Sequence, residues 1–132
     1  MSPKAQRIMG WVLTGLVGLF MIGVSGIPKF FDFPGKNEMM ETMGIPLTLL
    51  PAIAVIEIAV SVIYLIPRTS FLGAILLTGY LGGAVFTHLR IGEPWYFPII
   101  VGVLAWCGLA LRQPLVFTLA REGASARHRL SP

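Results

Sequence analysis

The sequence predicts an all-α integral membrane protein: a four-helix bundle with both termini in the cytoplasm and a short amphipathic helix in the first outer loop. Of the 132 residues, 55% are hydrophobic and only 12% are charged, whereas soluble domains usually carry about 25% charged residues. The mean hydropathy is +0.80. Four apolar stretches account for these values, and each is long enough, or nearly so, for a helix that crosses a bilayer. They are Ile8–Ile27, Ile45–Ile66, Phe71–Thr87 and Trp95–Leu111.

These stretches predict transmembrane helices at about 8–27, 46–66, 71–89 and 95–111. Residues 1–112 would then form one transmembrane domain, followed by a cytoplasmic basic tail at 113–132. The first stretch is longer than the 7–15 residues usual for the core of a signal peptide, and no A-x-A-like site follows it. We therefore expect it to remain as a membrane helix.

The distribution of Lys and Arg predicts the orientation. Seven of these residues lie at the termini or in the turn after the second helix, whereas Lys29, Lys36 and Arg90 lie on the opposite side. The side richer in Lys and Arg usually faces the cytoplasm. The sequence thus predicts a multi-pass protein of a cell membrane, with a bacterial inner membrane expected. The net charge of +4 does not indicate nucleic-acid binding, because the basic residues flank apolar segments and form no single patch.

The first helix is predicted to contain a close-packing surface and to end at a proline, and the loop after it is predicted to contain a short helix. Small residues allow a neighbouring backbone to approach closely, and Pro28 is expected to close the helix. In the loop at 28–46, the segment 37–44 predicts a short helix with Met40 and Met43 on one face. It either folds over the outer end of the bundle or serves as an interfacial anchor. The small residues of the first helix are Gly15, Gly18, Gly23 and Gly26.

The second helix carries a single charge, Glu57, near its middle. A carboxylate at that depth is disfavoured by roughly 2.5–3.5 kcal/mol, so it should face protein or water. Ser61 and Tyr64 follow at i+4 and i+7, which places three polar groups on one helix face. We expect this face to point into the bundle. Pro51 is either a first-turn residue or the site of a kink.

The third helix contains Gly79 and Gly83 in a Gly-x-x-x-Gly pattern, which predicts tight helix packing. Tyr80 lies about mid-depth in this helix, and Trp106 lies about mid-depth in the fourth. The tail after Arg112 begins as a possible interfacial helix to Glu122, but we expect a disordered solubilising tail.

A ligand pocket is predicted around Glu57. Counted from the outer surface, Glu57, Tyr80 and Trp106 lie at similar depths of about 14–16 Å. A neutral carboxyl could donate to a ligand there, with Ser61 on the same face. The alternative is a buried structural carboxyl bonded to Tyr80 or to the backbone. Three further residues would lie at the outer end, where they attract an anionic or oxygen-rich ligand or pair with Asp32, Glu38 or Glu93. They are Lys29, His88 and Arg90.

Other chemistries have little support in the sequence. Cys107 is the only cysteine, so the chain has no intramolecular disulfide and no paired thiols. His88 and His128 are expected on opposite sides, which argues against a haem held by both. A zinc site would need more ligands than this region offers. We expect no intrinsic metal or cofactor, apart from a possible bound quinone.

The residues resemble one known family. SGIPKF at 25–30, the intramembrane Glu57 and YLIPRTSFLGAILLTGYLGGAVFTHLR at 64–90 are similar to the DoxX-like family of small four-helix membrane proteins. The resemblance covers residues 8–115 and includes Lys29, Glu57, His88 and Arg90. It implies association with redox systems, because the family takes its name from a thiosulfate:quinone oxidoreductase and some relatives act beside oxidative-stress enzymes. Distant eukaryotic relatives assist receptor assembly.

Three functional hypotheses follow. The first is an accessory subunit of a quinone-linked redox or detoxification system, with a small-molecule pocket near Glu57. The second is a non-enzymatic assembly factor or lipid-binding protein. The third is a proton or solute pathway through Glu57. In each case the lipid bilayer is a partner, and a redox protein or a second copy of the chain is a possible one.

Overall fold

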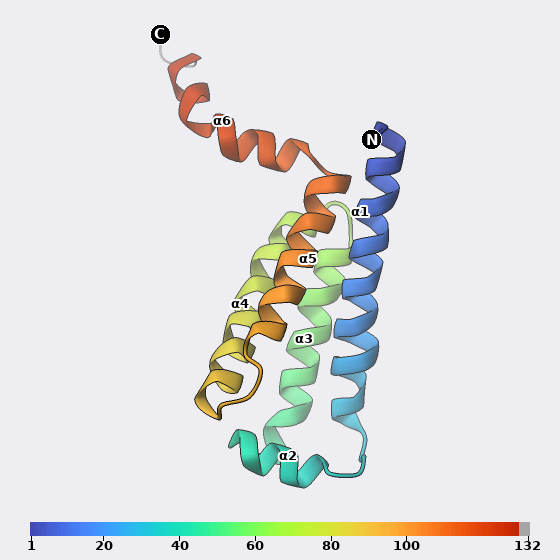
Figure 1. Cartoon of the computed structure of the whole chain (residues 1–132), viewed down its shortest axis with the longest axis vertical. Helices are drawn as coiled ribbons and strands as arrows, with labels where there is room; N and C mark the ends of the chain where they lie inside the picture. Colours follow the sequence, from blue (N-terminus) through green and yellow to red (C-terminus); the bar gives the residue numbers. More distant parts are fainter. Residues whose placement is uncertain (130–132) are drawn as a thin grey trace.

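The computed structural model describes residues 1–129, and side chains over residues 1–123. The all-α prediction is confirmed: the elements in this part of the chain are helices. The long helices run alongside one another, and the N-terminus lies at the same end of the bundle as the last described helix (Figure 1). We call this the termini end and the opposite one the α2 end. The six α-helices are α1 (Pro3–Gly18), α2 (Lys36–Met43), α3 (Leu50–Leu65), α4 (Ser70–Arg90), α5 (Tyr96–Arg112) and α6 (Leu115–Arg129).

The first span is longer than the sequence predicts. After α1 the chain continues as a π-helix, η1 (Leu19–Gly26), and then as a short 3-10 helix, η2 (Ile27–Phe30). The helical segment therefore runs from Pro3 to Phe30, 28 residues in all. The π-helix ends at Gly26, two residues before Pro28, and Pro28 lies in the first turn of the 3-10 segment that follows. Proline has no N–H to bond back along a helix, which fits the change from wide to tight turns at this point.

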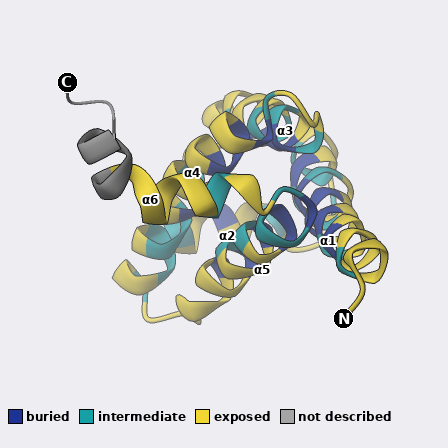
Figure 2. Cartoon of the chain, turned by 90° about the horizontal axis from the view of Figure 1, so that it is seen from above, coloured by how far each residue is buried: buried dark blue, intermediate teal, exposed yellow. Residues whose placement is uncertain are grey.

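The apolar surface of the bundle fits a membrane-integral, multi-pass protein. Three segments are long and apolar enough to cross a membrane: Pro3–Phe30, Leu47–Leu65 and Ser70–Arg90. The second of them begins with the 3-10 turn η3 (Leu47–Leu49), and Pro51 lies in the first turn of α3. The 17 residues of α5 span about 25 Å at 1.5 Å per residue, near the lower limit for a crossing. Buried positions line the inside of the bundle (Figure 2), while large apolar side chains cover its outside, among them Leu16, Leu19, Val55, Leu72 and Val103.

The helices pack as a ring in which α1 lies against α5, α5 against α4, and α4 against α3, with η1 closing the ring onto α3. Glycines mark the closest approaches. A Cβ added to Gly10 would lie 2.6 Å from the Arg112 nitrogen, and one added to Gly18 would lie 2.8 Å from the Leu65 side chain. Gly26 meets Ile58 in the same way, whereas Gly15 and Gly23 contact no neighbouring helix. The predicted close packing of the first helix is thus found at two of its four glycines.

The predicted short helix in the first loop is present as α2. It begins after Gly35 (φ 83°) and ends at Gly44 (φ 68°), both in the left-handed region that favours glycine. α2 crosses the α2 end of the bundle (Figure 1), and its residue Met40 is buried. The structure therefore agrees with a helix folded over the end of the bundle.

The tail after Arg112 differs from the disordered segment that the sequence favours. It forms α6, which leaves α5 at an angle of 98°. Phe117 of α6 packs edge-on against Trp106 of α5, with ring centroids 6.1 Å apart. This aromatic contact stabilises the first turns of α6. Residues 130–132 of the predicted tail lie outside the described residues.

Candidate functional site

A cavity of about 610 Å³ lies at the α2 end, between η1, α3, α4 and α5 and beneath α2. Its volume is within the range of small-molecule sites, which are typically about 300–1,000 Å³ and mainly apolar with a few polar groups. This cavity has the same character. Its apolar walls include Phe20, Met21, Ile53, Phe97 and Val101, and its polar residues are Ser25, Lys29, Glu57, Tyr80, Thr87 and His88.

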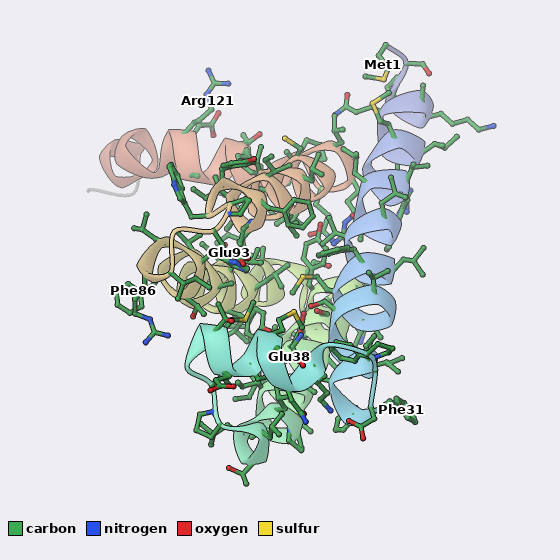
Figure 3. The ribbon with its side chains drawn as sticks, turned by 60° about the horizontal axis from the view of Figure 1, so that its bottom comes forward. Met1, Phe31, Glu38, Phe86, Glu93 and Arg121 are labelled. Atoms are coloured by element: carbon green, nitrogen blue, oxygen red, sulfur yellow. The ribbon has the colours of Figure 1, made fainter. Side chains whose placement is uncertain are left out.

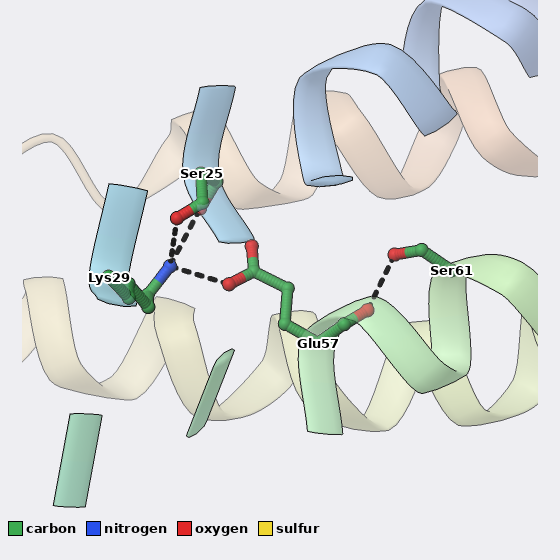
Figure 4. Close-up of polar contacts among 4 residues, drawn as sticks. All are labelled: Ser25, Lys29, Glu57 and Ser61. Atoms are coloured by element: carbon green, nitrogen blue, oxygen red, sulfur yellow. Dashed lines mark hydrogen bonds and ion pairs between the residues drawn. The ribbon is translucent and has the colours of Figure 1, made fainter. Parts of the chain in front are cut away.

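The central polar feature of the cavity is an ion pair between Lys29 and Glu57. The Lys29 ammonium donates to Glu57 Oε2 at 2.5 Å, and also to the backbone oxygen and hydroxyl of Ser25, at 2.8 and 2.9 Å (Figure 4). An ammonium group has three N–H donors, so all three have acceptors. The Glu57 side chain is 1% exposed and that of Lys29 is 21% exposed. The carboxylate is therefore buried but compensated by a fully hydrogen-bonded cation.

The sequence places Lys29 and Ser25 four residues apart, so they lie one turn apart on the same face of the η1–η2 segment. This segment packs against α3, which brings the ammonium opposite Glu57. The sequence analysis put Lys29 at the outer end of the bundle and considered Asp32, Glu38 or Glu93 as its partners. The structure corrects this, because Lys29 pairs with the intramembrane carboxylate itself.

The polar stripe of α3 points into the bundle, as predicted. Glu57, Ser61 and Tyr64 are all buried. Ser61, however, does not line the cavity: its hydroxyl donates to the backbone oxygen of Glu57 at 2.7 Å (Figure 4). A bond of this kind to the preceding turn satisfies the hydroxyl within its own helix. Ser61 thus bonds to the backbone at Glu57 and lies outside the cavity wall.

Tyr80 joins the cavity and Trp106 does not. Tyr80 lines the wall and interacts electrostatically with Glu57. The Trp106 indole N–H instead donates to the Thr78 hydroxyl at 2.8 Å, in a separate groove of about 470 Å³ between α4 and α5. One residue along a helix turns the side chain by about 100°. Val101 of α5 lines the cavity, and Trp106, five residues farther along, faces another side of the helix, which corrects the prediction of one shared pocket.

His88 and Arg90, the two other cations predicted at the outer end, have different contacts. His88 lines the cavity. Its Nδ1 is buried and has no hydrogen-bond partner, with a Glu93 carboxylate oxygen 3.8 Å away. Arg90 reaches α2, where its Nη2 donates to the backbone oxygen of Met43 at 2.5 Å. A basic group at the last carbonyls of a helix is favourable, so Arg90 holds the C-terminal end of α2 over the cavity.

We expect replacement of Arg90 by methionine to loosen α2, because the Met43 carbonyl would lose a charged donor. Hydrogen–deuterium exchange of residues 36–43 should accelerate, while exchange in α3 and α4 should stay unchanged. Arg121→Met is a matched control, since Arg121 is exposed on α6 at the other end. Unchanged exchange in α2 would mean that Arg90 is not its anchor.

Within the described part of this chain, Gly79 and Gly83 contact no neighbouring helix, although their spacing predicts tight packing. A Cβ added to either would meet no atom within 4 Å, and both residues line the cavity. The close approach of α4 to α3 occurs at Gly73, whose added Cβ would overlap the backbone of Tyr64. The two predicted packing residues are therefore part of the cavity wall.

A second polar cluster, which the sequence does not predict, lies at the termini end around Arg112. Arg112 is only 7% exposed. Its guanidinium donates to the Ser70 hydroxyl at 2.9 Å and the Tyr64 backbone oxygen at 3.0 Å, and stacks 4.6 Å from the ring centre of Trp11. These contacts join α5 to the turn between α3 and α4. Three methionines of α2 also line the cavity: Met39, Met40 and Met43. The sequence predicts only that Met40 and Met43 share one face of this helix.

Metal ligands are not gathered at this site. Among the described residues, no three His, Cys, Asp or Glu side chains lie close enough to hold a metal ion. The groups able to hold a ligand are thus the hydrogen-bonding side chains of the cavity: Lys29, Glu57, Tyr80 and His88.

Comparison with known proteins identifies the family. The sequence profile of the DoxX-like family matches residues 12–108, a range that contains every residue of the cavity. Searches of curated proteins and of solved structures give no match. The profile covers most of the chain, and so the protein belongs to the DoxX-like family.

Proposed function

We propose that this protein binds a lipophilic small molecule with hydrogen-bonding oxygens, of which a quinone is the best fit, and serves as an accessory subunit of a quinone-linked redox or detoxification system. The observation that carries the proposal is the buried Lys29–Glu57 pair in an otherwise apolar cavity of about 610 Å³. A charged pair is costly to bury. Recognition of a ligand would give this ion pair a function in addition to stabilising the fold.

The residues of the cavity fit both redox forms of such a ligand. The apolar walls suit a ring and the start of a tail. For the oxidised form, the Tyr80 hydroxyl is a donor for a carbonyl oxygen. For the reduced form, the Glu57 carboxylate is an acceptor for a hydroxyl, and His88 is a further polar residue of the cavity wall. When bound, a quinone supplies two-electron redox chemistry that these side chains do not have.

An accessory role follows from the thiol content. The single cysteine, Cys107, lies in the separate groove near Trp106, so the chain has no thiol pair at the cavity to exchange electrons with a quinone. We propose that electrons come from a partner protein, while this chain holds and orients the quinone in the bilayer. The cell membrane, with the termini in the cytoplasm, is the proposed location.

The proposal predicts saturable binding of decylubiquinone to the protein in lipid nanodiscs, measured by isothermal titration. Tyr80→Phe should weaken binding about three- to tenfold, the value of one lost hydrogen bond. Trp106→Phe is the control, because Trp106 lies outside the cavity, and should bind as wild type. Native mass spectrometry of the purified protein should show a retained quinone. A folded protein that binds no decylubiquinone would contradict the proposal, and a retained phospholipid alone would favour the lipid-binding hypothesis.

A further inference from the structure

The cavity is covered on the side that faces away from the bundle. Met39, Met40 and Met43 of α2 form part of its wall, and α2 lies across the end of the bundle (Figure 3). The helix is fastened at both ends. Arg90 donates to the Met43 backbone oxygen, and Lys36 donates to the Phe31 backbone oxygen at 2.8 Å. A ligand arriving from water at this end would have to displace α2.

The flank of the cavity between α3 and α4 is different. Near the termini end the two helices touch at Gly73 and Tyr64. Farther toward the α2 end, Gly79 and Gly83 of α4 are exposed and line the cavity, as does Ile56 of α3, which is 54% exposed. Exposed residues of the cavity wall indicate that the cavity reaches the surface here, as it also does at Val24 of η1 and Phe97 of α5. We call this place, defined by Ile56, Gly79 and Gly83, the side opening.

We propose that the ligand enters the cavity laterally from the bilayer through the side opening. This inference rests on the proposed function and narrows its ligand class. The ligand is a membrane-dissolved molecule whose polar head reaches Tyr80 and Glu57 while its apolar tail extends through the opening into lipid.

Two observations support an opening rather than a packing surface. Glycine is a poor helix former, yet a Cβ at Gly79 or Gly83 would meet no atom within 4 Å, so no contact within the chain explains these glycines. The same cavity contains the polar side chains of Glu57 and Tyr80, which a polar ligand head would meet. The glycines thus keep free a route that leads to the polar residues of the cavity.

The test fills the opening and compares two probes in nanodiscs: decylubiquinone, which has a ten-carbon tail, and the tail-less ring ubiquinone-0. In the double variant Gly79→Leu/Gly83→Leu, association of decylubiquinone, followed by stopped-flow quenching of tryptophan fluorescence, should slow about tenfold, as expected when entry requires a rearrangement. Association of ubiquinone-0, which has no tail to pass through the opening, should slow less than that of decylubiquinone; equal slowing of both probes would contradict a tail that extends through the opening. Gly82→Leu is the matched control, since Gly82 also has open space around it but lines the other groove; it should behave as wild type.

A second variant approaches the opening from the opposite helix. Ile56→Trp should slow decylubiquinone in the same way, and it keeps the test valid if the leucine variant fails to fold. Wild-type association rates in both variants would overturn lateral entry while leaving the proposed function intact. A wild-type protein that binds neither probe would overturn the proposed function and this inference with it.

Discussion

Replacing Lys29 by methionine should destabilise the bundle by about 3–5 kcal/mol, the usual cost of removing one partner from a buried ion pair. Glu57 is 1% exposed, and its carboxylate accepts a 2.5 Å bond from the Lys29 ammonium. Without that cation the carboxylate would remain buried beside the apolar walls of the cavity. The free energy of unfolding, measured by SDS titration of the protein in mixed micelles, should therefore fall steeply.

The double variant Lys29→Met/Glu57→Gln should recover most of this loss, because it removes both charges together. The difference between the single and double variants gives the coupling energy of the pair. Lys36→Met is the matched control. Lys36 donates only to backbone oxygens near the surface, so we expect a loss of no more than about 1 kcal/mol. A Lys29→Met protein as stable as wild type would contradict the ion pair.

Replacing Gly73 by alanine should also be strongly destabilising, by about 1–3 kcal/mol or more. The added Cβ would overlap the backbone nitrogen and Cα of Tyr64. Backbone atoms cannot rotate away as a side chain can, so α4 would have to shift from α3. That shift would also disturb the bond between Arg112 and the Tyr64 carbonyl.

The matched control is Gly79→Ala, six residues along the same helix. Its Cβ would meet no neighbour, and alanine is the better helix former by about 1 kcal/mol, so stability should stay the same or rise. Thermal unfolding in detergent compares the two variants. Equal destabilisation by both would indicate that Gly79 packs against another chain.

The sequence by itself determined the fold class and the position of the helices. Hydropathy and the spacing of apolar residues are local properties, and they placed four helices, the short helix α2 and the inward direction of the Glu57 stripe. The cost of a carboxylate in lipid was enough to predict that Glu57 is buried within protein. For α6 the sequence allows a helix to Glu122 but favours a disordered tail, because the ordering of this segment depends in part on the contact between Phe117 and Trp106.

Only the tertiary structure decided which polar groups meet. Lys29 and Glu57 are 28 residues apart, and their contact depends on how the η1–η2 segment lies against α3. Trp106 and Tyr80 have similar depths in the sequence, yet they face different cavities, since a helix turns by about 100° at each residue. The pattern of Gly79 and Gly83 is compatible with contact or with open space, and the divergence of α3 and α4 decides between them. The depth of a residue in the membrane can be counted from the sequence. The rotation of each helix and the distance between helices are set by packing in the folded protein.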